Sequence, residues 1–275
     1  MLEEIREIFK RRELLWILVK RNLTIRYKNS ALGFFWSLLT PVLMILVYIV
    51  FASILKFNSG RKDYLQFLVA GIVIWQFTAG CLNDSLYSIA GNSNLVKKVF
   101  FPRVILPVST ALANGVNFLL TFVILLLFLA VTGAADLSRA YWLIPAISMH
   151  LILGVGIACL CATANVFFRD MQHLVGIGSL AWFFLSPVFY DLELQTGIMK
   201  FGNPQLGGIV FLNPMSGILA AYRAGIMNYP LLPEAAPGVA LNPLWLLLSA
   251  GVCAGVAITG ILALRLGDKY FGDVL

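Results

Sequence analysis

The chain has 275 residues, of which 60% are hydrophobic and only 12% are charged, and its mean hydropathy is +0.89. A typical soluble domain carries about 25% charged residues, so this composition excludes a soluble globular protein and indicates a membrane protein with several spans. The formal net charge of +7 does not indicate a nucleic-acid binder, because the basic residues are divided among short loops. We expect one integral domain, residues 1–275.

Residues 1–30 begin the chain with an amphipathic pattern. Apolar side chains recur at roughly helical spacing, and basic residues fill much of the remainder. This pattern is typical of a helix, or a pair of helices, that lies on the cytoplasmic membrane surface with its apolar face in the lipid. Two roles stay open for it: an anchor that fixes the topology, or a contact with a gate or a partner.

Six runs of at least 20 residues contain no Asp, Glu, Lys or Arg. About 20 apolar residues cross the hydrocarbon core of a bilayer. A backbone inside lipid must satisfy its own hydrogen bonds, which favours helices. We therefore predict an all-α membrane protein with six transmembrane helices, covering about residues 33–55, 65–85, 104–131, 142–168, 173–190 and 243–264.

Residues 92–103, NSNLVKKVFFPR, separate the second predicted span from the third. Lys97 and Lys98 make the segment too basic for lipid, yet five of its residues are large and apolar. We expect a short amphipathic element at the membrane surface that contacts another protein. Phe100 and Phe101 would be its anchors, because buried aromatic residues commonly dominate the binding energy of an interface.

Residues 191–240 join the fifth predicted span to the sixth. Their central part, residues 201–222, has no charged side chain but is interrupted by four glycines and two prolines. A continuous spanning helix is therefore not expected. A re-entrant pair of short helices in the outer leaflet fits better, because broken backbone is tolerated at membrane depth where protein buries it.

The distribution of Lys and Arg predicts the orientation. If the N-terminus is cytoplasmic, fourteen of the 20 basic residues fall on the cytoplasmic side of the six spans and six fall outside. Cytoplasmic loops carry an excess of Lys and Arg. Both termini are therefore expected in the cytoplasm.

The chain lacks the motifs of several competing classes. It contains no GxxxxGK[ST] phosphate-binding loop, no HExxH and no GxSxG, and its two histidines have no metal-ligand spacing. Ion-coupled carriers usually carry ionisable residues inside their spans. Asp84 is the sole candidate acid here, and near a span end it more often caps a helix or pairs with a nearby base. An active transporter built this way would need energy from a partner.

Four segments stand out in chain order. They are RYKNSALGFFW at 26–36 running to Pro41, LVKKVFFPR at 95–103 leading to Leu106-Pro107, FRDMQH at 168–173 with SPVFY at 186–190, and LNPM at 212–215 followed by Tyr222-Arg223. Together they resemble the membrane subunit of a type-2 ABC exporter for polysaccharides, a family that includes O-antigen (Wzm-like) and teichoic-acid exporters. The resemblance covers nearly the whole chain and is closer to the O-antigen exporters.

The resemblance implies a homodimer of six-helix subunits in the bacterial inner membrane, working with two cytoplasmic ATPase subunits. ATP and magnesium would bind to the ATPase, and this chain would carry no catalytic residue, cofactor or metal. The implied function is the export of a lipid-linked, O-antigen-like polysaccharide from the cytoplasm across the inner membrane.

The resemblance also implies roles for single residues. The coupling helix at residues 92–103 would dock on the ATPase through Leu95, Lys97, Lys98, Phe100, Phe101 and Arg103. The N-terminal gate helix would act through Ile5, Ile8, Phe9 and Trp16. Spans one and five line the path in the family, and their aromatic rings offer sugars flat amphipathic surfaces. The candidates are Phe35, Trp36, Tyr48, Trp182, Phe183 and Phe189.

Three rival interpretations share part of the pattern. A type-2 ABC exporter of teichoic acid, or of a small drug or lipid, would have the same architecture. A membrane glycosyl- or acyltransferase would need clustered acids or histidines, which the sequence lacks. An ion-coupled carrier is disfavoured by the missing charges inside the spans.

Overall fold

The computed structural model describes residues 11–27, 35–55, 63–98, 101–190, 210–227 and 243–274. Within these ranges the regular elements are all helices, and a single bridge between Ala135 and Met227 is the one β-type contact. The prediction of an all-α protein is therefore confirmed.

The elements are α2 (Arg12–Tyr27), α3 (Trp36–Leu55), α4 (Tyr64–Ser85), α5 (Tyr87–Ala90), α6 (Ser93–Lys98), α7 (Ile105–Val131), η2 (Ala140–Trp142), α8 (Leu143–Phe167), α9 (Met171–Leu185), α10 (Pro214–Ile226), α11 (Pro243–Gly267), η5 (Asp268–Tyr270) and α12 (Phe271–Val274).

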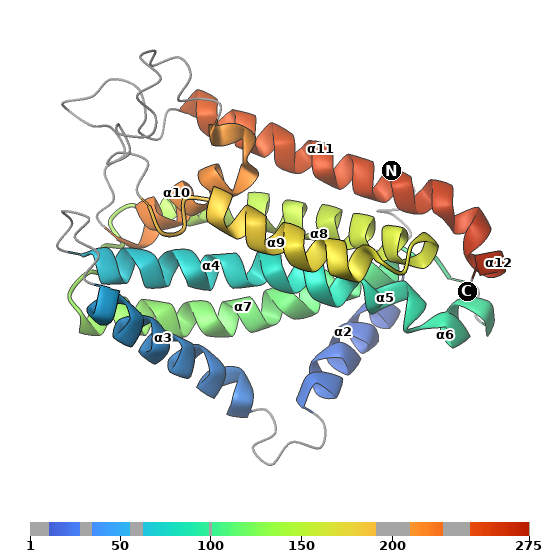
Figure 1. The fold of residues 1–275 in the computed structure, drawn as a ribbon, viewed down its shortest axis with the longest axis horizontal. Coiled ribbons are helices and arrows are strands. Elements are labelled where there is room, and N and C mark those ends of the chain that lie inside the picture. The colour runs from blue at the N-terminus through green and yellow to red at the C-terminus, as the bar shows by residue number, and fades with distance from the viewer. Residues whose placement is uncertain are drawn as a thin grey trace.

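Within the described ranges, four helices are long and apolar enough to cross a membrane, namely α4, α7, α8 with the preceding turn η2, and α11. They run along the long axis of the molecule (Figure 1). The other two predicted spans coincide with shorter apolar helices, Leu39–Val50 within α3 and the whole of α9. At 1.5 Å per residue, a 15-residue helix such as α9 reaches about 22 Å, less than the ~30 Å hydrocarbon core.

Helix α9 ends at Leu185, before the predicted end of the fifth span at Tyr190. Pro187 explains the difference, because proline disfavours a helical conformation of the residue before it and cannot donate a backbone hydrogen bond. Ser186 accordingly has an extended backbone, with φ −91° and ψ 146°. The chain leaves the helix with backbone carbonyls that need other donors.

Helix α10 supplies those donors. Its Arg223, which is only 1% exposed, donates to the carbonyl oxygens of Pro187 at 2.7 Å, Val188 at 2.9 Å and Phe67 at 3.3 Å. Asn213, the N-cap of α10, donates to the carbonyl oxygen of Leu185 at 3.2 Å. The third and fourth sequence motifs therefore meet in space.

Every residue of α10 is buried. This helix lies within residues 191–240, where a re-entrant pair is predicted, whereas residues 191–209 and 228–242 lie outside the described residues. At its end, the backbone N–H of Asp136 donates to the carbonyl oxygen of Ile226 at 3.0 Å. The connection between α7 and α8 therefore lies at the same end of the bundle as the end of α10.

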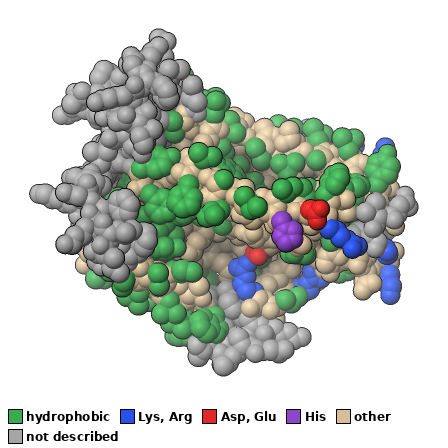
Figure 2. All heavy atoms as spheres, in the orientation of Figure 1, with side chains coloured by type: hydrophobic (Ala, Val, Ile, Leu, Met, Phe, Trp, Pro, Cys, Tyr) green, Lys and Arg blue, Asp and Glu red, His purple; other side chains and the backbone are tan. Residues whose placement is uncertain are grey.

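A second hydrophobic cluster lies at the opposite end of the bundle, and we call it the end cluster. Figure 1 shows α5, α6 and α12 gathered there. Its buried members come from α2, from α5 to α7 and the connection between them, from α8, and from the C-terminal elements, and they include Leu18, Ile89, Val96, Phe101, Ile105, Val166, Leu264 and Phe271. Lys and Arg side chains gather mainly toward this end on the face shown in Figure 2, and hydrophobic side chains are spread over much of the same face.

Candidate functional site

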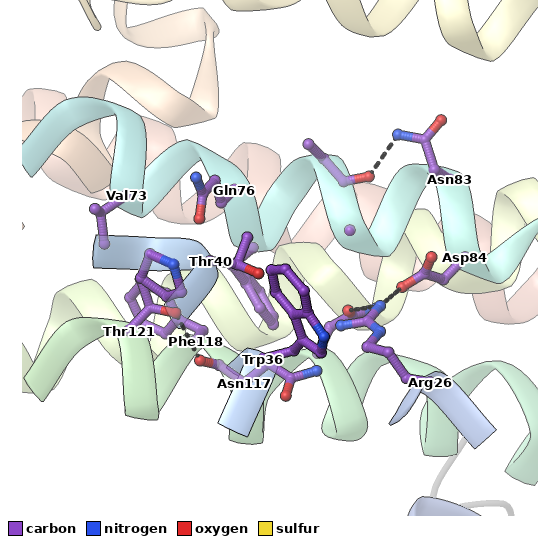
Figure 3. Close-up of a pocket in the computed structure, with 15 residues that line it drawn as sticks. Arg26, Trp36, Thr40, Val73, Gln76, Asn83, Asp84, Asn117, Phe118 and Thr121 are labelled. Carbon is purple, nitrogen blue, oxygen red and sulfur yellow. Dashed lines mark hydrogen bonds and ion pairs between the residues drawn. The ribbon is translucent and has the colours of Figure 1, made fainter. Parts of the chain in front are cut away.

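A cleft lined by polar side chains lies between several of the helices. One cavity of about 490 Å³ is lined by α2, α3, α4 and α7 (Figure 3). An adjoining cavity of about 260 Å³ shares four of its lining residues: Arg26, Asp84, Asn114 and Asn117. We call the two together the polar cleft. Polar side chains in a membrane domain usually line water-filled cavities or substrate paths, so this cleft is the candidate functional site.

An ion pair lies where the two cavities of the cleft adjoin, because both of its residues line both cavities. Arg26, near the end of α2, pairs with Asp84 near the end of α4, and it donates a second hydrogen bond to Asn114 Oδ1 on α7 at 3.0 Å. Both charged side chains remain 38% exposed. One of the two roles expected for Asp84, pairing with a nearby base, is confirmed. The pair and the second hydrogen bond join α2 to two long apolar helices, α4 and α7.

Helical spacing places the other polar groups on the walls of the cleft. Gln76 and Asn83 lie seven residues apart on α4, as do Asn114 and Thr121 on α7. Residues that are two turns apart share one face of a helix. This spacing was visible in the sequence, but only the packing of α4 against α7 turns it into a site.

Gly80 allows the two walls to approach. A Cβ atom at this position would lie 2.9 Å from Asn114 Oδ1, which real Cβ contacts do not reach. The absence of a side chain at Gly80 therefore lets Asn114 lie where Arg26 can bond to it.

The structure separates the six aromatic candidates into groups. Trp36 lines the cleft, where it lies between the Arg26–Asp84 pair and Thr121 (Figure 3). Phe35 is 57% exposed, and Tyr48 packs against the main core.

The three candidates on or after α9 form a packed row of rings. Trp182 and Phe183 contact Trp75 of α4, with ring centroids 5.6 and 5.5 Å apart, and Phe189 lies 4.7 Å from Phe183. Trp182 also donates to Asn213 Oδ1 at 2.9 Å. Among the described residues that line the cleft, none of these three appears.

The predicted coupling segment, residues 92–103, follows α5 and contains α6 and part of the connection to α7. Lys97 and Lys98 are exposed, whereas Leu95 is partly buried against the end cluster. Phe101 is 7% exposed and belongs to the end cluster. Phe101 therefore holds the segment against the bundle, while Phe100 lies outside the described residues.

Arg103 binds the C-terminal elements instead of facing solvent. Its guanidinium donates to the main-chain carbonyl of Asp268 and, at 3.0 Å, to its Oδ1. The guanidinium carbon also lies 5.9 Å from the ring centroid of Phe271, which is fully buried. Nothing in the sequence pattern pointed to this contact.

The gate-helix candidates are only partly described. Ile5, Ile8 and Phe9 lie outside the described residues, and Trp16 on α2 is 65% exposed. Helix α2 packs against α7 through Leu18 and Val19, which are buried. Within the described ranges, no group of three or more His, Cys, Asp or Glu side chains could hold a metal ion.

The bundle of apolar helices around a polar cleft defines a multi-pass membrane protein with the features of a transporter. Residues 13–227 match the ABC-2 type transporter family. The chain therefore belongs to this family, whose members are transporter permeases, and the resemblance carried by the four motifs is confirmed.

Individual relatives cover most of the chain. An O-antigen export system permease protein RfbA of Klebsiella pneumoniae is 29% identical over 218 residues, which cover 78% of this chain and 81% of the relative. A protein of the same name from Myxococcus xanthus is 31% identical over 245 residues, covering 88% of this chain and 90% of the relative.

Proposed function

We propose that this chain is the transmembrane subunit of an ATP-driven exporter that moves a lipid-linked, O-antigen-like polysaccharide from the cytoplasm across the inner membrane. The observation that carries the proposal is the similarity to O-antigen export permeases over 78% to 88% of the chain. The polar cleft supports it, because a polar path is what a hydrophilic polymer needs inside a membrane domain.

In this proposal α3 and α9 complete a set of six spans, and both termini are cytoplasmic. The end cluster then lies at the cytoplasmic surface, in agreement with the basic side chains near it. Two copies of the chain form the exporter. The second copy would cover α9, which has no buried residue and exposes Leu174, Ile177 and Leu180 by 60% to 71%.

The energy comes from two cytoplasmic ATPase subunits, which bind ATP and magnesium. Residues 92–103 dock on them, with Lys97 and Lys98 steering the contact or lying against anionic lipid headgroups. Because Phe101 and Arg103 are already engaged within the chain, they transmit the motion, and the exposed side of α6 with Phe100 makes the contact.

The geometry suggests how the motion reaches the cleft. Helix α4 precedes the coupling segment and α7 follows it, and both helices line the cleft. A displacement of α6 would therefore move Asp84 and Asn114 relative to each other. Since both groups bind Arg26, the same displacement would reach the interface helix α2.

Loss of the chain tests the proposed function in the bacterium that produces it. Deletion should abolish surface polysaccharide and leave the lipid-linked polymer inside the cell, and the restored chain should co-purify with an ATPase. The double substitution Lys97→Glu with Lys98→Glu should reduce this co-purification, whereas Arg139→Glu, between α7 and α8, should not. Unchanged surface polysaccharide after deletion would refute the proposal, and loss of a teichoic acid, drug or lipid instead would select that alternative.

A further inference from the structure

We infer that the polar cleft is a binding subsite for uncharged sugar units of the transported polymer. The inference rests on the proposed function and narrows its substrate class to a neutral glycan, as opposed to a phosphate-rich polymer such as a teichoic acid. Three features of the described residues carry it: the balance of charge, the amide groups on the walls and the exposed indole of Trp36.

The charge in the cleft is already balanced. Among the described residues that line it, Arg26 and Asp84 are the charged side chains, and they pair with each other. Arg26 Nη2 is also bonded to Asn114 Oδ1. Anion sites normally offer Arg or Lys donors directly to the ligand. An anionic ligand here would compete with Asp84 for Arg26 and would be repelled by the Asp84 carboxylate.

Amide side chains suit the hydroxyl groups of a sugar. Each carboxamide offers two donor hydrogens and an acceptor oxygen, and each hydroxyl can also donate and accept. Gln76 lines the cleft without a hydrogen-bond partner among the described residues. The Nδ2 group of Asn114 is buried and has no partner in the described part of the chain, which costs free energy unless a ligand or water supplies an acceptor.

Trp36 adds an apolar surface of the right kind. Trp36 is 38% exposed and lies between the ion pair and Thr121 along the cleft (Figure 3). An aromatic face accepts the apolar C–H face of a sugar ring, while the polar edge of the ring reaches the amides. A mixed wall of one indole and several amides therefore fits a polyhydroxylated ring better than an acyl chain.

The size of the cleft agrees with this ligand. The larger cavity, about 490 Å³, falls within the ~300–1,000 Å³ range of ligand pockets. The adjoining cavity of about 260 Å³ extends it past Arg26 toward Asn22 and Asn92. The cleft therefore accommodates a short stretch of the polymer, held by weak contacts that allow movement.

Photo-crosslinking in the intact exporter tests the inference. The photoreactive residue benzoylphenylalanine replaces Gln76 in one variant and Thr40, a second cleft position, in another. Each full-length variant is co-produced with the ATPase, and ATP hydrolysis is blocked so that the polymer is arrested inside the exporter. The control position is Val123, which is 55% exposed on α7 and does not line the cleft. Co-purification of the ATPase verifies that each variant is assembled.

Irradiation should give a slowly migrating adduct that stains for vicinal diols at Gln76 or Thr40 and none at Val123. Adding Trp36→Ala should lower the yield several-fold. The polymer released from the cells by mild acid should pass unretained through an anion-exchange column. The absence of adducts at both cleft positions in assembled exporters, or a polymer retained on the column, would overturn the inference while leaving export intact. No export by the wild-type chain would instead refute the proposed function.

Discussion

Arg223 shows how a single residue can hold together the end of the bundle opposite the end cluster. A buried cation is costly unless its donors find acceptors, and here main-chain carbonyls from α4 and from the break after α9 accept hydrogen bonds from Nη1 and Nη2. The ring of Phe67, whose centroid lies 3.4 Å from the guanidinium carbon, adds a cation–π contact. The side chain therefore fixes three elements relative to one another.

Gly71 tests this arrangement. A Cβ atom at Gly71 would lie 2.5 Å from Arg223 Nη2 and 2.8 Å from the carbonyl oxygen of Val188. Because overpacking of this kind typically costs about 1–3 kcal/mol, Gly71→Ala should lower the midpoint of thermal unfolding in detergent. Gly178→Ala in α9 is the control, since nothing lies within 4 Å of its added Cβ. Equal stability of the two variants would contradict the packing described for Arg223.

Sequence reasoning found some of these residues and missed their contacts. It selected Asp84 as the sole candidate acid in the predicted spans, and Trp36 as an aromatic residue on span one, which lines the path in the family that the chain resembles. It could not place Arg26 beside Asp84 and Asn114, which lie 58 and 88 positions away. Such contacts depend on helix packing, and no local pattern encodes them. The burial of Arg223 was missed for the same reason, and its charge was counted with the external loops.

At the scale of elements, long uncharged runs made α4, α7, α8 and α11 predictable, because apolar helices of this length have few alternatives in a membrane. Predicting where α9 ends would have required the local effect of Pro187 on the backbone of the preceding residue. The C-terminal elements η5 and α12 carry no strong periodic pattern. Their position depends on Arg103, 165 positions before Asp268, and on the burial of Phe271 in the end cluster.

The Arg103–Asp268 pair should therefore influence coupling to the ATPase. The two side chains are 24% and 45% exposed, so breaking the pair should cost up to about 1 kcal/mol, or about fivefold in an equilibrium. Arg103→Asp and Asp268→Arg should each reduce ATP-dependent export at constant protein level. The double variant should recover part of the lost export, because an ion pair forms again with the two charges exchanged. Additive losses in the double variant would show that the pair does not position the segment.

At the scale of the whole molecule, the proposed orientation has the end cluster in the cytoplasm and the α7–α8 connection outside. The four native cysteines are buried, so introduced cysteines can report the topology. Ser138→Cys, at an exposed position between α7 and α8, should react with a membrane-impermeant thiol reagent in intact spheroplasts. Lys97→Cys should react only after the membrane is opened. The opposite pattern would invert the proposed orientation.

The most direct test of the central claim is transport by the purified components. The chain and its ATPase are reconstituted together in liposomes that contain the lipid-linked polymer, and polymer on the side opposite the ATPase is measured with a glycan-cleaving enzyme. With the ATPase and the enzyme both outside the liposomes, exported polymer enters the lumen. The fraction of polymer protected from the enzyme should therefore rise only when ATP, magnesium and both proteins are present. Equal transfer without ATP or without the ATPase would contradict the central claim.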